Sequence, residues 1–175
     1  GYRPPDVAAA TRIVALHPLK ETPEHGLKLR WCETRLGRNA RLAGIKHLNR
    51  LEQVLAQNEW RDPAIAEGLL CDTEGEVVCG TASNLFAVID GVLTTPDLRY
   101  SGVRGIMRAE VLKRAKEIGV EVNEGPLRQE DVVAASEVFV TNAVRGVRSV
   151  CALGAHRWSL GPITECLRDR IESQP

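Results

Sequence analysis

Residues 67–95 hold a close succession of short strand signals, and this pattern limits the fold more than any other feature of the sequence. The stretches EGLLCD, EVVCG, NLFAVI and VLTT are rich in Leu, Val, Ile and Phe. The turn sequence TEG and the hairpin dipeptide Asp90-Gly91 interrupt them. We therefore expect a meander of short β-strands in this part of the chain.

The rest of the chain alternates between further strand patterns and helical spacing of apolar residues, without internal repeats. The expected strands are TRIVAL at 11–16, LKLRWCE at 27–33, VEVNEG at 120–125, EVFVTN at 137–142, VRSV at 147–150 and HRWSL at 156–160. One expected helix runs from Leu48 to before Pro63, one begins near Gly105, one lies near QEDVVAA and the last begins near Pro162. This mixture predicts an α+β domain whose barrel-like sheet carries helices on its outside.

The length of 175 residues suits one domain with a hydrophobic core, since domains typically have about 100–200 residues. The first stretch, GYRPPDVAAA, contains no initiator Met and is rich in Pro and Ala, which is typical of a linker. We therefore assign 1–10 as the remnant of an interdomain linker and 11–175 as the folded domain. Such a start also suits the later part of a longer protein.

The balance of charges argues against polyanionic partners. Lys and Arg together number 23 and Asp and Glu also number 23, so we expect a small-molecule partner rather than a nucleic acid or an anionic membrane. The sequence has neither an apolar run of membrane-spanning length nor a secretory leader, which predicts a cytoplasmic protein. Its 5 cysteines are odd in number and form no CxxC pair, which favours reduced thiols over disulfides or a metal site.

Lys46 has a notable position within LAGIKHLNRLEQVLAQ, residues 42–57, between a loop that contains Gly44 and the expected helix. Most lysines are solvated, so this position alone carries little weight. Lysine is nevertheless the residue whose amine can be uncharged and whose long stem lets it form a covalent bond and then move a proton. Lys46 is therefore a candidate catalytic residue.

Two longer stretches form recognisable motifs. The first is LGRNARLAGIKHLNRLEQVLAQ, which surrounds Lys46, and the second is CGTASNLFAVIDGVLTTPDLRYSGVRGIMR at 79–108. Both resemble the fold-type IV pyridoxal-phosphate enzymes, the family of the branched-chain and D-amino-acid aminotransferases and of aminodeoxychorismate lyase, and the first is most similar to the lyases. In the second, these residues fit the family pattern: Asn84, Leu85, Phe86, Leu93, Thr95, Val103, Gly105, Ile106 and Arg108. The resemblance implies the C-terminal barrel-like domain of the D-amino-acid aminotransferase-like fold, without the smaller N-terminal domain.

The resemblance also implies a binding site for pyridoxal 5′-phosphate. By resemblance, Lys46 forms the Schiff base with this cofactor and Val103 packs on a face of its ring. The backbone N–H groups of Ile106 and Met107, which open a helix, face the phosphate at the positive end of the helix dipole. Asn142 falls at the position of a further phosphate contact, although an Asn after a strand is most often a turn residue.

The sequence departs from the family at Cys79. Relatives have there a glutamate that pairs with the pyridine nitrogen of the cofactor, and a thiol with a pKa of about 8.5 is a poor anionic partner. Glu76 lies three residues away along a strand, so we expect it on the opposite face. Arg145 and Arg148 either bind carboxylates of an anionic substrate or are solvated surface charges.

The resemblance implies a lyase that converts aminodeoxychorismate to p-aminobenzoate and pyruvate in folate biosynthesis, with Lys46 as the main proton shuttle. One alternative is a D- or branched-chain amino-acid aminotransferase of the same family, which uses the same lysine. Another is an inactive truncated domain that only associates with partner chains, because part of the family's pocket is missing and Cys79 replaces the usual acid. Relatives are homodimers, so the resemblance implies a homodimer that binds a small-molecule substrate.

Overall fold

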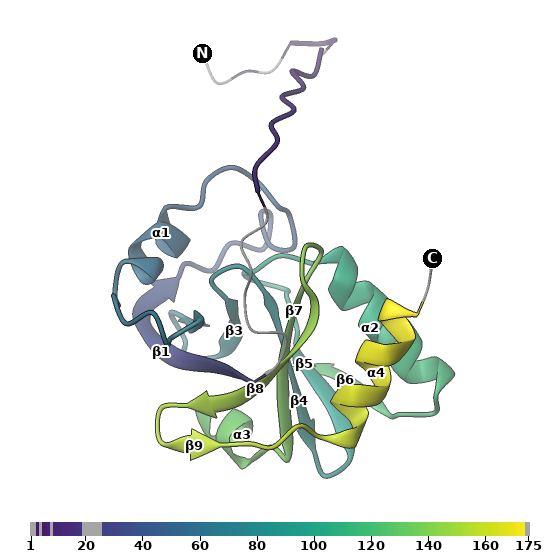
Figure 1. Cartoon of the computed structure of the whole chain (residues 1–175). Coiled ribbons are helices and arrows are strands. Elements are labelled where there is room, and N and C mark those ends of the chain that lie inside the picture. Colours follow the sequence, from purple (N-terminus) through teal and green to yellow (C-terminus); the bar gives the residue numbers. More distant parts are fainter. Residues whose placement is uncertain (1–2, 4, 8, 19–25, 174–175) are drawn as a thin grey trace.

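The strands of the described chain join in one sheet that curls into a half-barrel, with helices packed against it (Figure 1). The computed structural model describes residues 3, 5–7, 9–18 and 26–173. Its strands are β1 (Leu27–Leu36), β2 (Glu67–Asp72), β3 (Val77–Gly80), β4 (Asn84–Ile89), β5 (Val92–Pro96), β6 (Val122–Gly125), β7 (Glu137–Asn142), β8 (Gly146–Leu153) and β9 (His156–Arg157). Its helices are α1 (Leu51–Gln57), α2 (Ile106–Glu117), α3 (Gln129–Ala134) and α4 (Pro162–Glu172). The prediction of an α+β domain with a barrel-like sheet is confirmed.

The strand order in the sheet is β3-β2-β1-β8-β7-β4-β5-β6, and β9 pairs with β8. Strand β1 runs parallel to β2, and β5 runs parallel to β6. Parallel neighbours need a crossover connection, and α1 and α2 lie in these two connections. The antiparallel pair β4 and β5 is joined at Asp90 and Gly91, whose φ angles of 50° and 82° suit a tight hairpin turn.

Apolar layers hold the helices against two parts of the sheet. Phe86 of β4 stacks on Phe139 of β7 with ring centroids 4.9 Å apart, and α2 and α4 cover this pair with Val111 and Leu167. Figure 1 shows these two helices beside one another over this part of the sheet. At the end formed by β1, β2 and β3, α1 contributes Ala56 to a smaller buried layer. Helix packing thus supports the curled sheet in two places.

Helix α4 begins where a buried carboxylate supplies hydrogen-bond acceptors to its first turn. Pro162 occupies the first helical position, where its missing N–H needs no partner. Glu137, buried on β7, accepts hydrogen bonds from the backbone N–H groups of Ile163 (3.1 Å) and Thr164 (2.8 Å). The helix dipole also favours a negative charge at this end. Glu137 therefore attaches the start of α4 to the sheet.

Most of the predicted elements are confirmed by the structure. Strands β2, β4 and β7 have the predicted bounds of 67–72, 84–89 and 137–142. Turn residues flank each of these stretches in the sequence, so their ends are marked locally. The predicted helix near Gly105 begins at Ile106, and the last helix begins at Pro162 as predicted.

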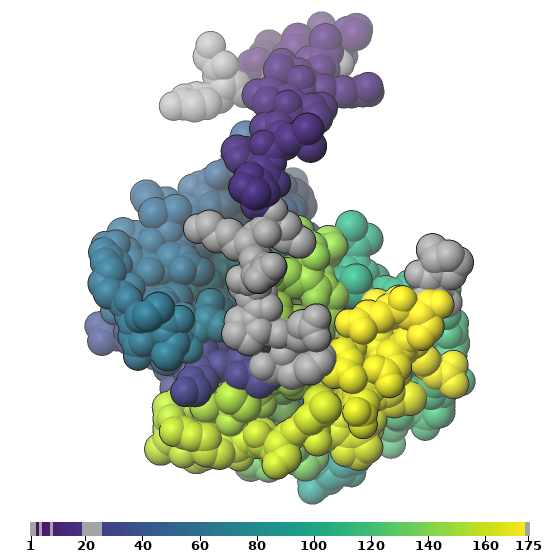
Figure 2. All heavy atoms as spheres, in the orientation of Figure 1, coloured from purple at the N-terminus to yellow at the C-terminus, as the bar shows by residue number. Residues whose placement is uncertain are grey.

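The strand predicted at 11–16 is wrong. These residues have no regular secondary structure, and Ile13, Val14 and Leu16 are 87%, 91% and 96% exposed. Figure 2 shows residues 9–18 standing clear of the rest of the molecule. A strand needs a neighbour that pairs with its backbone groups, and a suitable side-chain pattern does not supply one.

Several other boundaries differ from those predicted, and two of these differences have a visible cause. The helix expected from Leu48 begins at Leu51, because the carbonyls of Ile45 and His47 accept hydrogen bonds from the Arg50 side chain instead of from a first helical turn. The strand expected at 156–160 is limited to β9, because the chain then leaves β8 to reach the start of α4. Within the described ranges, no helix combines the length and the apolar character needed to cross a bilayer.

Candidate active site

A cavity of about 340 Å³ lies where the loop before α1, the β3–β4 connection, the loop before α2 and the end of β7 meet. Small-molecule sites typically have volumes of about 300 to 1,000 Å³. The residues that line it include Lys46, Cys79, Val103, Ile106 and Asn142, all of which the sequence predicts as site residues. The side chain of Met107 is not part of the described lining, but its backbone N–H belongs to the first turn of α2. We call this cavity the lysine pocket.

Lys46 extends from a loop that is tied to the loop before α2. The N–H of Gly44 donates to the carbonyl of Gly102, and the N–H of Arg104 donates to the carbonyl of Gly44, each at 3.0 Å. Gly44 has a φ of 83°, and a Cβ atom there would come within 3.1 Å of the Arg104 side chain. The side chain of Lys46 is exposed and lines the pocket. The local backbone is therefore fixed while the amine stays accessible.

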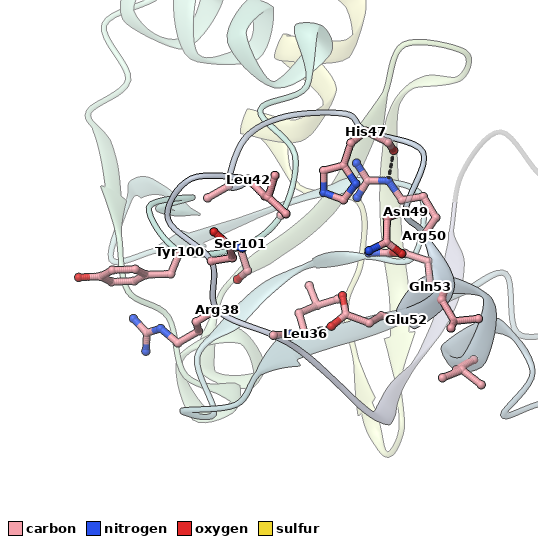
Figure 3. Close-up of a pocket in the computed structure, with 16 residues that line it drawn as sticks. Leu36, Arg38, Leu42, His47, Asn49, Arg50, Glu52, Gln53, Tyr100 and Ser101 are labelled. Atoms are coloured by element: carbon pink, nitrogen blue, oxygen red, sulfur yellow. Dashed lines mark hydrogen bonds between the residues drawn. The ribbon is translucent and has the colours of Figure 1, made fainter. Parts of the chain in front are cut away.

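The guanidinium of Arg50 fixes the backbone on both sides of Lys46. Its Nε donates to the carbonyl of His47 and its Nη2 donates to the carbonyl of Ile45, each at 3.0 Å. Figure 3 shows the first of these bonds. Arg50 directly precedes α1, and its side chain extends back to the carbonyl of His47. Sequence reasoning missed Arg50, because the backbone carbonyls that it binds are brought to it only by the folded loop.

A second cavity of about 500 Å³, shown in Figure 3, shares lining residues with the lysine pocket. Arg50, Gln53 and Gly102 line both cavities, whereas His47 lines only the second and Lys46 only the first. The two cavities therefore flank the loop that carries the lysine. The candidate nucleophile belongs to the smaller of the two.

The N-terminus of α2 forms the wall of the lysine pocket that suits an anion. Gly105, the residue before the helix, has an extended conformation and provides no side-chain cap. The first N–H groups of a helix, here those of Ile106 and Met107, have no intrahelical acceptor. Asn84 holds this turn in place, since its Nδ2 donates to the carbonyl of Val103 at 2.8 Å and a Cβ at Gly105 would overlap its Oδ1. The uncapped helix end is thus built to receive a negatively charged group.

The end of β7 contributes two polar side chains to the lysine pocket. The Oδ1 of Asn142 accepts hydrogen bonds from the N–H groups of Val144 (3.0 Å) and Arg145 (2.9 Å), so Asn142 forms the turn that its position after a strand indicated. Its contact with a phosphate stays a prediction. Thr141 is 1% exposed, and its hydroxyl has no hydrogen-bond partner among the described residues. Sequence reasoning missed Thr141, because an unpaired hydroxyl is visible only in three dimensions.

The lysine pocket has a buried thiol where the family resemblance places an acid. Burial, and secondly the negative charge of Glu67, raises the pKa of Cys79 to about 12, so the thiol is neutral at pH 7. Among the described residues that line the pocket there is neither Asp nor Glu, whereas Lys46 and Arg50 contribute positive charge. The pocket therefore favours anionic ligands and offers no anion to a cationic ring.

Glu67 lies beneath the β3–β4 connection rather than in the lysine pocket. Its Oε1 accepts hydrogen bonds from the N–H of Ala82 (2.6 Å) and the hydroxyl of Ser83 (2.9 Å). Burial raises the pKa of its carboxyl, although these hydrogen bonds oppose the shift. Ala82 and Ser83 line the pocket, so Glu67 positions one of its walls.

Other charged residues considered from the sequence lie outside the lysine pocket. Arg148 is 8% exposed on β8, so its interpretation as a solvated surface charge is wrong, and its role toward a substrate stays a prediction. Arg145 is partly exposed in the turn after β7. Glu76 forms an ion pair with Arg38 at 3.9 Å. In the part of the chain that the structure describes, no group of three or more His, Cys, Asp or Glu residues is arranged to hold a metal ion.

Comparisons with known proteins agree with the expectation from these residues. The family model described as amino-transferase class IV matches residues 1–153. The chain is 36% identical over 154 residues to aminodeoxychorismate lyase of Vibrio harveyi, covering 86% of this chain and 57% of that protein. It is 38% identical over 120 residues to the branched-chain-amino-acid aminotransferase of Escherichia coli K12, covering 67% of this chain and 39% of that protein.

A solved structure shows the same architecture. The crystal structure of 4-amino-4-deoxychorismate lyase from Pseudomonas aeruginosa matches with a TM-score of 0.83 and 47% identity, covering 85% of this chain and 55% of that one. The chain spans about half the length of the lyases that it matches.

Proposed function

Because this chain belongs to the amino-transferase class IV family, whose members use pyridoxal phosphate, we propose that it is the cofactor-binding part of an enzyme in which Lys46 carries the chemistry. One observation carries the proposal: the amine of Lys46 and the uncapped N-terminus of α2 lie on one cavity of about 340 Å³. An amine and an anion site that share a small cavity match the aldehyde and the phosphate of this cofactor.

The donor set of the lysine pocket fits pyridoxal phosphate. The N–H groups of Ile106 and Met107 would hold the phosphate, and Val103 lines the space between this site and the loop of Lys46. Two buried polar atoms in the lining, the hydroxyl of Thr141 and the Oε1 of Gln53, have no partner among the described residues and are available to a ligand. Cys79 is the one departure, because its neutral thiol supplies no charge to the ring nitrogen.

We propose the following roles for the residues of this chain. When bound, pyridoxal phosphate supplies an aldehyde that condenses with amines and a ring that withdraws electrons from the carbon beside the amine. With the cofactor bound, the Nζ of Lys46 would hold it through its aldehyde carbon. The same Nζ, once released, would take the proton from the amine-bearing carbon of the substrate. Arg50 keeps the backbone of Lys46 in place during this exchange.

For the reaction, we propose the release of pyruvate from aminodeoxychorismate to give p-aminobenzoate for folate synthesis. Support comes from the lyases of Vibrio harveyi and Pseudomonas aeruginosa, to which the chain is similar over most of its length. The second candidate is amino-group transfer by a branched-chain aminotransferase, which the Escherichia coli relative supports.

We also propose a cytoplasmic homodimer, with residues 1–10 as the end of an interdomain linker. Analytical ultracentrifugation tests the assembly.

The covalent role of Lys46 is tested by borohydride reduction of the protein loaded with pyridoxal phosphate, followed by peptide mass spectrometry. We expect the reduced adduct on Lys46, because among the described lysines this one lines the pocket. The matched control is Lys46→Arg, which keeps the positive charge but has no amine that forms this bond. An adduct found chiefly on Lys20, Lys28, Lys113 or Lys116 would contradict the proposal.

The reaction is tested by two assays on the full-length protein. Pyruvate release from aminodeoxychorismate, followed with lactate dehydrogenase, measures the lyase. Transfer of the amino group from a branched-chain amino acid to a keto acid measures the transaminase. We expect turnover in the first assay, and turnover only in the second would establish the aminotransferase instead.

A further inference from the structure

We propose that the hydroxyl of Thr141 donates a hydrogen bond to a phosphate oxygen of the ligand in the lysine pocket, an assignment that rests on the proposed function. This hydroxyl lacks a hydrogen-bond partner among the described residues. Thr141 is 1% exposed and its Oγ1 has neither a donor nor an acceptor among the described residues. Proteins rarely leave a buried polar group in this state unless a ligand or water completes it.

A second buried threonine shows how the same side chain is normally satisfied in this sheet. Thr95 on β5 is 0% exposed, and its hydroxyl donates to the carbonyl of Leu85 at 2.7 Å. Thr95 does not line the lysine pocket, whereas Thr141 does. Of these two threonines, the one that lines the cavity is therefore the one whose hydroxyl is unpaired. Thr81 also lines the cavity, but its hydroxyl is bonded to Gln57 and Glu67.

The position of Thr141 in the sheet brings its hydroxyl to the anion site. Thr141 pairs with Asn84 across β7 and β4. Side chains of directly paired residues lie on the same face of a sheet, with Cβ atoms roughly 5 Å apart. Asn84 in turn donates to the carbonyl of Val103 and abuts Gly105, the residue before α2. The hydroxyl of Thr141 therefore lies beside the uncapped N-terminus of α2.

The hydrogen-bonding groups at the N-terminus of α2 favour the binding of an oxygen anion. The N–H groups of Ile106 and Met107 are donors only. The hydroxyl of Thr141 can serve as a third donor beside them. No carboxylate lies among the described residues of the lining, so no negative charge competes for these donors. A phosphate monoester offers several charged acceptor oxygens to such a group.

The test compares Thr141→Val, which removes the hydroxyl and keeps the shape, with Thr141→Ser, which keeps a hydroxyl. Dissociation constants are measured on the cofactor-free full chain by fluorescence titration with pyridoxal phosphate and with pyridoxal, which lacks the phosphate. We expect Thr141→Val to bind pyridoxal phosphate about tenfold more weakly, equivalent to about 1.4 kcal/mol, and to bind pyridoxal as the unchanged protein does. Thr141→Ser should retain the affinity to within about threefold.

Thermal unfolding of the cofactor-free protein separates a ligand contact from a structural role. Thr141→Val should unfold at the same temperature or a higher one, because it removes an unpaired buried hydroxyl. The control Thr95→Val should unfold at a lower temperature, because it leaves the carbonyl of Leu85 without a bond, and should leave cofactor affinity unchanged.

Three results would overturn the proposal: unchanged affinity of Thr141→Val for pyridoxal phosphate, an equal loss of affinity for pyridoxal, or a fall in melting temperature like that of Thr95→Val. Inorganic phosphate distinguishes this proposal from the proposed function, because it should raise the melting temperature of the unchanged protein more than that of Thr141→Val. If phosphate does so but Lys46 forms no reducible adduct, the proposed function alone is wrong. If neither phosphate nor pyridoxal phosphate stabilises the unchanged protein, the proposed function and the role of Thr141 are both wrong.

Discussion

Among single residues, Cys79 leaves the lysine pocket without an anion beside the site of the cofactor ring. Its thiol stays neutral because burial raises its pKa to about 12. Cys79→Glu should place an anion beside the ring of the cofactor and favour the protonated ring nitrogen, with about 1.4 kcal/mol for each pKa unit of that nitrogen. We therefore expect faster turnover by Cys79→Glu than by the unchanged full-length protein at saturating cofactor.

Cys79→Ser is the matched control for this prediction, because it keeps a small neutral side chain and should not accelerate the reaction. The ultraviolet-visible spectrum of the loaded protein reports the protonation of the ring independently of turnover. If the unchanged protein is as fast as Cys79→Glu, then another group serves the ring nitrogen.

Glu67 should make the stability of the protein depend on pH. Burial raises the pKa of its carboxyl, so the folded chain binds more protons than the unfolded chain above the unfolded pKa of about 4.3. The free energy of unfolding therefore falls as the pH rises from this value toward the raised pKa. Glu67→Gln keeps an amide oxygen for Ala82 and Ser83 but does not titrate, so its stability relative to the unchanged protein should increase over this range.

Urea denaturation between pH 4 and pH 8 measures this difference. Glu117→Gln is a control of opposite sign, because the hydrogen bond from Arg114 lowers the pKa of Glu117. Near neutral pH the unchanged protein should have a larger free energy of unfolding than Glu117→Gln. This difference should disappear as the pH falls through the lowered pKa of Glu117. A Glu67→Gln curve parallel to that of the unchanged protein would contradict the shift.

At the scale of elements, the start of α2 allows its backbone donors to be tested without breaking the helix. Ile106 is the first helical residue, where proline is well tolerated, and Gly105 has φ −66° and ψ 145°, the conformation that proline requires before it. Ile106→Pro should therefore keep the helix but remove one N–H, and should weaken the affinity for pyridoxal phosphate at least about tenfold. Met107→Ala keeps its N–H and should change the affinity less than about twofold.

Fluorescence titration measures both affinities, and circular dichroism verifies that the helix is retained in each variant. Equal effects of Ile106→Pro and Met107→Ala would exclude a phosphate site made of backbone N–H groups.

The helices and strands also show which parts of the fold can be predicted from the sequence. Strand β4 was predicted to the residue because Asn84 and the Asp90-Gly91 turn mark its ends locally. The strand expected at 11–16 failed because pairing depends on a distant neighbour that no local pattern reveals. The late start of α1 has a similar cause, since Arg50 binds carbonyls of the loop behind it.

The same limit applies to the candidate site. Lys46 and Ile106 were found because short motifs surround them, and the structure brings both to one pocket. Thr141 and Arg50 were missed because their importance depends on which atoms they contact, or fail to contact, after folding.

At the scale of the whole molecule, the lysine pocket joins segments from four separate parts of the chain. A ligand that contacts all four should stabilise the fold as a unit, by about 2.7 kcal/mol at a concentration one hundred times its dissociation constant. For a chain of this size we expect a rise in melting temperature of roughly 5–11 °C with pyridoxal phosphate. Differential scanning fluorimetry measures the rise, removal of the cofactor should reverse it, and an unchanged melting temperature would contradict it.

The two hydrogen bonds from Arg50 also have a consequence for how fast the amine of Lys46 can move. They fix the peptide groups next to Lys46, so its amine changes position by rotation about side-chain bonds rather than by displacement of the loop. Rotamer changes of exposed side chains take picoseconds to nanoseconds, whereas loop movements extend to microseconds. If Lys46 acts as proposed, the return of its amine to the substrate carbon should therefore be fast compared with typical turnover, and solvent viscosity should have little influence on the proton-transfer step.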